Sequence, residues 1–178
     1  PTPATDAEII SLADTALKRL GITEVKVHIN SIGCPNCRPK YYDMLKGYLN
    51  QHKDCLCEDC LNRLDRNPMR ILDCKQESCK KVAAGAPIAL DYLCDDCREH
   101  FEKVKTYLDD MGIEYEIDTN IVRGLDYYTK TVFEFVSTNI GAQGTICGGG
   151  RYDGLISQLG GQATPGMGFG CGLERLIM

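Results

Sequence analysis

The stretch from Gly166 to Leu176, which reads GMGFGCGLERL, alternates four glycines with larger residues and ends in a Glu-Arg pair. Side chains on a β-strand alternate between its two faces, so the glycines share one face and leave it bare. Met167, Phe169 and Cys171 then pack on the other face. A bare backbone face accommodates a flat ring such as adenine. A glycine strand that is closely packed in the core, without a binding role, would account for two such glycines, but not for four followed by Glu-Arg.

From Leu173 onward we predict a helix whose first turn carries Arg175, where the positive end of the peptide dipoles favours an anion such as phosphate. Two upstream stretches add polar groups. Residues 148–154 read GGGRYDG and offer the hydroxyl of Tyr152. Residues 122–128 read VRGLDYY and supply a fixed cation, Arg123, with the phenols of Tyr127 and Tyr128. The sequence contains no Walker A motif, dinucleotide-binding Gly fingerprint or Gly-x-Ser-x-Gly motif.

Nine of the eleven cysteines lie between Cys34 and Cys97, and eight of them form four pairs at chelating spacing. The pairs are Cys34/Cys37, Cys57/Cys60, Cys74/Cys79 and Cys94/Cys97. Eight thiolates can fill two closed, structural zinc sites, because each tetrahedral ion takes four. The sequence-local pairing puts Cys57/Cys60 with Cys74/Cys79, which leaves the two outer pairs to tie the ends of the segment together. Disulfides or reduced buried thiols are the alternative interpretation.

The cysteine-rich segment is also the less acidic part of the chain. Residues 34–112 carry a net charge of −1 and the remainder −4. This segment is therefore the better candidate for a nucleic-acid contact. Several cations lie beside the cysteines and could offset thiolate charge or touch phosphates: Arg38, Lys75, Lys80, Lys81 and Arg98. Cys55, Cys147 and Cys171 are expected to stay uncoordinated.

Hydrophobic periodicity predicts an α+β fold. We expect a helix that starts at a capping-box motif in residues 5–8 and ends at Gly21, followed by a strand over 25–29. Helices are expected around 42–49 and 101–111, strands over 114–117 and 131–136, and a turn over 139–144. Strands joined by short turns favour an antiparallel sheet. The three histidines, His28, His52 and His100, are interpreted as surface or edge residues.

Composition excludes several classes of protein. The chain has 178 residues, of which 43% are hydrophobic and 25% charged, and a net charge of −5 argues against an indiscriminate polyanion binder. No apolar run approaches the roughly 20 residues of a membrane helix, and the first residues lack the features of a signal peptide. We therefore expect a soluble, cytoplasmic protein with no membrane partner.

Together these motifs resemble the histidyl-tRNA synthetase family of class II aminoacyl-tRNA synthetases. Residues 166–176 resemble class II motif 3, while residues 123–128 with 131–134 and residues 149–155 resemble the two histidine-specific motifs. The resemblance implies part of a class II antiparallel sheet with flanking helices, interrupted by a mainly helical, Cys-rich insertion domain. The first part of the catalytic domain would be residues 1–33, the insertion 34–112 and the second part 113–178.

The resemblance also implies a chemistry: ATP with Mg²⁺ activates L-histidine as histidyl-adenylate, and the histidyl group then moves to its tRNA. Arg123 would be the catalytic cation at the α-phosphate and the histidine carboxylate, and Arg175 would hold the distal phosphates. Tyr128 and Tyr152 would read the imidazole, supported by Tyr127. The adenine side would be lined by Gly168, Gly170 and Gly172. The full-length enzyme would be a homodimer whose insertion domain lies near the tRNA acceptor stem.

Motifs 1 and 2 and the anticodon-binding domain of the family are not found in these residues. We therefore expect an internal piece of the enzyme that is inactive alone. Two other interpretations remain open at this point. One is a non-catalytic, synthetase-like regulatory subunit of histidine biosynthesis, and the other is a zinc-knuckle nucleic-acid-binding module without chemistry of its own.

Overall fold

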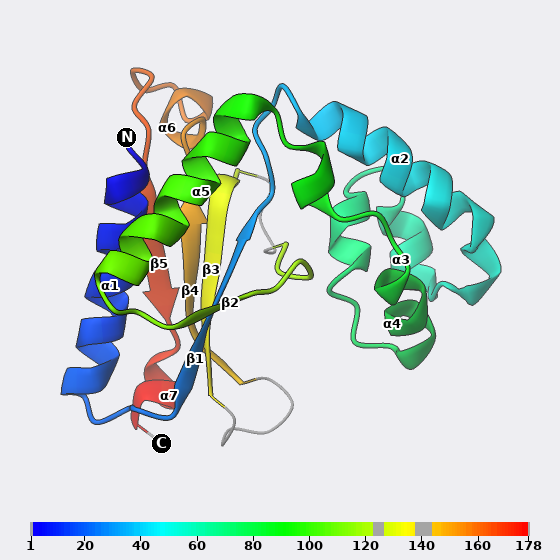
Figure 1. Ribbon diagram of the computed structural model, residues 1–178. Helices are drawn as coiled ribbons and strands as arrows, with labels where there is room; N and C mark the ends of the chain where they lie inside the picture. Colours follow the sequence, from blue (N-terminus) through cyan, green and yellow to red (C-terminus); the bar gives the residue numbers. More distant parts are fainter. Residues whose placement is uncertain (1, 123–126, 138–143, 178) are drawn as a thin grey trace.

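The computed structural model describes residues 2–122, 127–137 and 144–177, which form a five-stranded sheet with helices on one side and a helical lobe on the other (Figure 1). The strand order is β2-β1-β3-β4-β5. The strands are β1 (Val25–Ser31), β2 (Tyr115–Ile117), β3 (Thr129–Ser137), β4 (Thr145–Arg151) and β5 (Met167–Cys171). The predicted α+β class is confirmed.

The pairs β1/β3, β3/β4 and β4/β5 are antiparallel, whereas β1 and β2 are parallel. The predicted antiparallel sheet is confirmed for three of the four pairs, and β2 adds a parallel edge that was not predicted. A parallel pair needs a crossover connection, and the long segment between β1 and β2 provides it. Its last helix, α5 (Asp95–Asp110), runs back along the sheet, so β2 starts at the same end as β1 (Figure 1).

Helices α1 (Pro3–Arg19) and α5 lie side by side over one face of the sheet (Figure 1). Their apolar stripes meet the side chains of alternate strand residues, among them Phe133 and Phe135 of β3. The helix residues of this core are Ala7, Ile10, Ala13 and Leu17 from α1 and Phe101, Val104 and Leu108 from α5. Burial of these side chains drives the packing of both helices.

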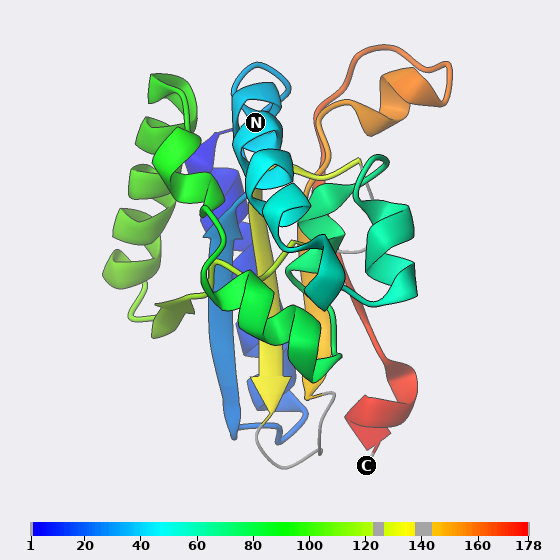
Figure 2. The same cartoon turned by 90° about the vertical axis from the view of Figure 1, so that its right-hand side faces the viewer.

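The helical lobe lies on the opposite side of the sheet from α1 and α5 (Figures 1 and 2). It contains α2 (Arg38–Gln51), α3 (Glu58–Arg63), α4 (Glu77–Ala84) and the short 3₁₀ turns η1 (Lys53–Cys55), η2 (Pro68–Ile71) and η3 (Ala89–Tyr92). Tyr41, Leu45 and Leu49 form the buried side of α2. The lobe core continues to the sheet through Ile32, Val122 and Val132. After β4 come α6 (Leu155–Gln158) and α7 (Leu173–Ile177).

Helix α1 begins at Pro3, earlier than the capping box at residues 5–8 predicts. No side chain caps it, and proline near the first turn is already in a helical φ. The Asp6 carboxylate is instead used elsewhere, as described below. Most of the predicted turn over 139–144 lies outside the described residues.

The division of the chain at residues 33 and 112 stays a prediction. The packing of α5 bears on it, because Phe101, Val104 and Leu108 belong to the same core as the strands and α1. The lobe core, in contrast, is formed mainly by residues from Tyr41 to Ala89. We propose that the second boundary of the lobe lies near the start of α5.

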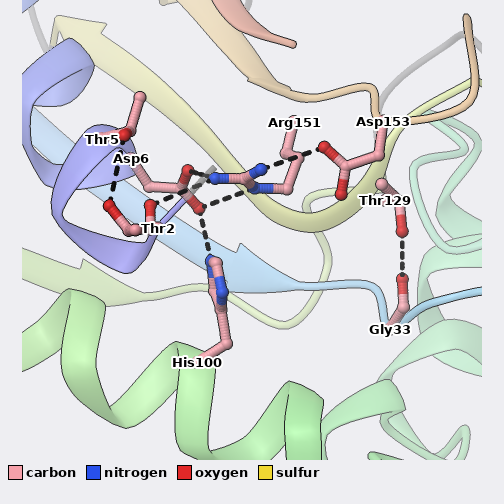
Figure 3. Close-up of polar contacts among 8 residues, drawn as sticks. All are labelled: Thr2, Thr5, Asp6, Gly33, His100, Thr129, Arg151 and Asp153. Atoms are coloured by element: carbon pink, nitrogen blue, oxygen red, sulfur yellow. Dashed lines mark hydrogen bonds and ion pairs between the residues drawn. The ribbon is translucent and has the colours of Figure 1, made fainter. Parts of the chain in front are cut away.

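A buried polar network joins α1, α5 and the end of β4 (Figure 3). Asp6 and Arg151 are 0% and 1% exposed, and the Arg151 guanidinium donates to both carboxylate oxygens of Asp6. His100 Nε2 lies 2.7 Å from Asp6 Oδ2, and Arg151 also donates to Asp153 Oδ1 at 2.9 Å. The interpretation of His100 as a surface residue is therefore wrong, since it is a buried partner of Asp6.

Replacing Asp6 with Asn should lower the free energy of unfolding by about 3 kcal/mol, because removal of one partner leaves Arg151 buried without its counter-charge. Burial raises the pKa of Asp6, but hydrogen bonds from His100 and Arg151 outweigh it and hold the pKa below its usual value. The stabilisation is therefore fully present above the ordinary carboxyl pKa of about 4 and disappears as the pH falls below it.

Urea unfolding of the Asp6→Asn variant at pH 7 and below pH 4 measures this effect. Glu99→Gln is the control, since it removes an exposed pair with Lys103 and should change little. A difference between wild type and Asp6→Asn that stays constant with pH would contradict the assignment.

Candidate active site and cysteine clusters

A cavity of about 460 Å³ lies on the sheet face opposite α1 and α5, over β4, β5 and the segment before β3. Its lining consists of Tyr127, Tyr128, Gly148, Tyr152, Leu155, Gly168, Phe169 and Gly170. Five of these residues were predicted as site residues from the sequence: Tyr127, Tyr128, Tyr152, Gly168 and Gly170. The fold thus brings residues of all three Gly-rich and Tyr-rich stretches, 122–128, 148–154 and 166–176, to a single place.

Glycines of two neighbouring strands form the floor of the cavity. Gly148 pairs with Gly170 and Gly150 with Gly168, so these residues share one face. A Cβ atom built on Gly170 would meet nothing within 4 Å, whereas one on Gly168 would lie 3.0 Å from the Tyr152 hydroxyl. Met167 and Phe169 pack in the core beneath α1 and α5. The predicted bare face of β5 is confirmed at Gly170, whereas the Tyr152 side chain lies over Gly166 and Gly168. The expected packing of Cys171 is wrong, since this residue is exposed.

Three tyrosine side chains border this floor, that of Tyr152 over Gly166 and Gly168 and that of Tyr128 over Gly150. The ring centroids of Tyr127 and Tyr128 are 4.6 Å apart, and the Tyr127 and Tyr152 rings meet edge to face at 6.0 Å. The backbone N–H of Tyr152 donates to the carbonyl of Gly166, which fixes it beside the start of β5. The arrangement combines a flat backbone surface with aromatic walls, which suits a ligand with planar rings and polar edges.

Two predicted residues lie at the other end of β5. The guanidinium of Arg175 donates to the carbonyl of Thr145, and the N–H of Gly172 donates to the carbonyl of Ile146. Neither residue lines the cavity. Arg123, the predicted catalytic cation, lies outside the described residues. Sequence reasoning missed Leu155 and did not single out Gly148, whose membership follows from its register opposite Gly170.

The eight paired cysteines form two clusters, with the pairing that the sequence predicts. Within each cluster all four Sγ atoms lie within 4.8 Å of one another. The first cluster comprises Cys34, Cys37, Cys94 and Cys97, and the second comprises Cys57, Cys60, Cys74 and Cys79. The first joins the start of α2 to the start of α5, and the second lies inside the lobe.

The sulfur spacing fits a tetrahedral metal ion. The Sγ atoms of Cys34 and Cys37 are 3.8 Å apart, as are those of Cys34 and Cys94, and those of Cys37 and Cys97 are 3.9 Å apart. A zinc ion with Zn–S bonds of about 2.3 Å gives tetrahedral edges of about 3.8 Å. A disulfide needs about 2.05 Å. All eleven cysteines, which lie within the described residues, are free thiols.

The electrostatics of the clusters also favour a cation. Burial raises the pKa of the Cys34 thiol, but hydrogen bonds from the backbone of Cys37 and Asn36 outweigh it and lower that pKa to about 7. Burial and the neighbouring thiols raise the pKa values of Cys60 and Cys97 well above normal. Four crowded thiolates repel one another, so full ionisation needs a compensating positive charge, which a divalent ion supplies.

None of the helices in the described ranges has the length and apolar character needed to cross a bilayer.

The family profile, the similar sequences and the similar solved structure all point to the same family. The profile of the family described as "Histidyl-tRNA synthetase" matches residues 1–176. The "Histidine--tRNA ligase" of Caldanaerobacter subterraneus subsp. tengcongensis is 60% identical over 173 residues, which cover 97% of this chain and 42% of that protein. The enzyme of the same name from Acetivibrio thermocellus is 60% identical over 178 residues, or 100% of this chain and 43% of that protein.

Among solved structures, apo histidyl-tRNA synthetase of S. aureus matches with a TM-score of 0.76 and 38% identity, over 99% of this chain and 43% of that one. The chain therefore spans about two fifths of the length of these relatives.

Gly150 of β4 and Gly170 of β5 should respond differently to replacement by alanine. Gly150→Ala should lower the free energy of unfolding by about 1 to 3 kcal/mol, since its Cβ would lie 2.7 Å from the Thr131 carbonyl oxygen and 2.9 Å from the Tyr128 ring. Gly170→Ala should leave stability unchanged, because its Cβ would enter open space. Urea denaturation of both variants decides the matter, and equal destabilisation would show that the floor is not open at Gly170.

Proposed function

Because the chain belongs to the histidyl-tRNA synthetase family, we propose that the whole protein is a histidine–tRNA ligase, joining L-histidine to its tRNA through a histidyl-adenylate. The observation that carries the proposal is the family match over residues 1–176 together with the cavity, where the tyrosines of the histidine-specific motifs meet the glycine floor of motif 3. ATP with Mg²⁺ supplies the energy for activation.

The cavity suits the two planar parts of histidyl-adenylate. The bare backbone at Gly170 offers a surface on which adenine can lie without meeting a side chain, and the Tyr152 hydroxyl borders it at Gly168. Tyr128 and Tyr152, which both line the cavity, offer phenol groups to the imidazole nitrogens, while the Tyr127 ring packs between them. Gly172 would complete the adenine side where β5 passes into α7.

Arg123 and Arg175 would bind the negative charges of the ATP phosphates and of the histidine carboxylate. Arg123 would lie against the α-phosphate and the histidine carboxylate, where a fixed cation stabilises the pentavalent phosphorus as it forms. Arg175 would bind the distal phosphates from the first turn of α7, exchanging its bond to the Thr145 carbonyl for one to the ligand. Both roles come from the family resemblance.

We propose structural zinc ions for both cysteine clusters. Each cluster provides four sulfur ligands, so no coordination position stays open for a substrate or a water. The ions would neutralise crowded thiolates and hold the lobe folded. Reduced thiols at these spacings suit a reducing compartment, so we place the protein in the cytoplasm.

The remaining partners are proposed from the family. The helical lobe lies on the side of the sheet away from α1 and α5 (Figure 2). In this position the acceptor stem of histidine tRNA could reach the lobe. The whole protein would act as a homodimer. A regulatory subunit without catalysis would not need the three tyrosines that gather at the cavity. A zinc-knuckle binding module would leave the glycine floor unexplained.

Tyr128→Phe and Tyr152→Phe should weaken histidine binding more than ATP binding. A buried polar group of the substrate loses its partner in each case, which costs about 1 to 3 kcal/mol. Michaelis constants of the whole protein for histidine and for ATP in pyrophosphate exchange measure the two effects. Equal changes in both constants would show that these phenols do not read the imidazole.

Arg123→Ala should lower kcat for histidine activation by about 100-fold or more, since a cation that acts on developing charge is lost. Pyrophosphate exchange at saturating histidine and ATP separates this effect from weaker binding. An Arg123→Ala protein that exchanges as fast as wild type would remove Arg123 from the mechanism.

The protein purified under reducing conditions should contain about two zinc ions per chain, one for each closed four-cysteine cluster. Zinc should dissociate as the pH falls, because protons compete for the thiolates. Elemental analysis measures the content. Cys55→Ser is the control, since Cys55 is exposed and belongs to neither cluster. A metal-free, reduced and cooperatively folded protein would refute the zinc assignment.

A further inference from the structure

The lobe leaves the sheet beside the residues that carry the cavity tyrosines. Gly33, which follows β1, has φ +70°, and Lys130 in β3 has φ +54°. The N–H of Lys130 donates to the Gly33 carbonyl at 2.8 Å, and the N–H of Ile32 donates to the Lys130 carbonyl at 2.9 Å. The Thr129 hydroxyl also donates to the Gly33 carbonyl (Figure 3). A non-glycine residue in this strained conformation persists only where its surroundings hold it, often next to a functional site.

Arg38 bridges this junction to the cavity. It begins α2 directly after Cys37, and its guanidinium donates to the Tyr128 carbonyl at 2.7 Å and to the Gly33 carbonyl at 3.2 Å. Its Nε donates to the Ile32 carbonyl at 3.4 Å. One planar cation therefore joins β1, the lobe and the segment before β3, using the fork geometry that lysine lacks.

The sheet alone does not hold Tyr128. Tyr128 precedes the first residue of β3, and the register between β3 and β4 shifts between Thr129 and Val132. Tyr128 is only 8% exposed and forms part of the cavity lining. The bond from Arg38 therefore fixes the backbone from which the Tyr128 ring projects.

The first cysteine cluster fixes Arg38 in turn. The backbone N–H of Arg38 donates to the Cys34 carbonyl at 3.0 Å, so Arg38 belongs to the turn that presents Cys34 and Cys37. Cys94 and Cys97 anchor this turn to α5, which packs on the sheet. A metal ion shared by the four sulfurs would thus hold Arg38 at a fixed distance from Tyr128.

We propose that Arg38 is a positioning residue for histidine binding, and that metal in the first cysteine cluster keeps Tyr128 in place through it. The second cluster shares the lobe core with Tyr128, but the bonds of Arg38 to the Tyr128 and Cys34 carbonyls tie only the first cluster to the Tyr128 backbone. The inference rests on the proposed function, because it assumes that the cavity takes histidine.

Arg98 provides a matched control within the same cluster. It follows Cys97 as Arg38 follows Cys37, and its N–H donates to the Cys94 carbonyl at 2.9 Å. Its side chain is exposed, and its guanidinium donates to the Leu93 carbonyl at 3.5 Å. Replacing it removes an equal charge beside the same sulfurs without touching Tyr128.

The test is calorimetric titration of the whole protein with histidine and, separately, with ATP, combined with zinc analysis of each variant. Arg38→Met should weaken histidine binding by about 10-fold, since small displacements of a positioned group have effects of this size or more. ATP affinity and zinc content should stay at the wild-type values. Arg38→Lys, which keeps the charge but not the fork, should lie between the two, and Arg98→Met should match wild type.

The cluster is tested by Cys97→Ser against Cys79→Ser, two fully buried ligands of the two clusters. Each should lose zinc, but Cys97→Ser should weaken histidine binding more than Cys79→Ser, because only the first cluster holds the turn that carries Arg38. Equal losses for Arg38→Met and Arg98→Met, equal losses for histidine and ATP, or equal losses for the two cysteine variants would overturn the proposal. A wild-type protein that does not bind histidine would instead contradict the proposed function.

Discussion

Side chains along β3, β4 and β5 alternate between the two faces of the sheet, and this alternation determines both the core and the cavity. One face of these strands carries Phe133, Phe135 and Phe169, which pack beneath α1 and α5. The other face carries glycine at the paired positions of β4 and β5, so the backbone itself forms a surface there. The same register that buries the core therefore creates the cavity floor, and a slip of one residue would exchange the two faces.

Cations on both sides hold this sheet in place. On the core side, Arg151 pairs with Asp6 and joins the end of β4 to α1 and, through His100, to α5 (Figure 3). On the cavity side, Arg38 joins the root of the lobe to the backbone of Tyr128. Arg151 directly precedes Tyr152, so both tyrosines of the proposed histidine pocket project from backbone that a buried or half-buried arginine anchors.

The parts of the fold that the sequence predicted correctly depend on short-range patterns. The period of two in residues 166–172 is enough to assign the bare face of β5, and cysteine spacing is enough to pair the clusters. Long-range contacts were not predictable in this way. Asp6 lies 145 residues from Arg151 and 94 from His100, so no local pattern links them. The parallel β2 edge depends on where α5 returns the chain, which periodicity does not specify.

Some of the residues predicted for the site line the cavity, and others do not. Tyr127, Tyr128, Tyr152, Gly168 and Gly170 gather at one cavity, as the motifs suggested. Arg175 and Gly172 lie beyond its lining, because the strand end at Cys171 separates them from it. The resemblance supplied their roles, whereas the geometry supplied Gly148 as a further part of the floor.

Calorimetric binding of a non-hydrolysable histidyl-adenylate analogue to the whole protein, comparing wild type with Gly170→Val, tests whether the glycine face is the binding surface. A side chain at residue 170 enters open space above the floor, so the fold should keep its urea midpoint. Wild type should bind the analogue, and the variant should bind it at least about 10-fold more weakly, because a bulky group now occupies the binding surface. Equal affinity of the two proteins for the analogue would contradict the assignment of this glycine face as the binding surface.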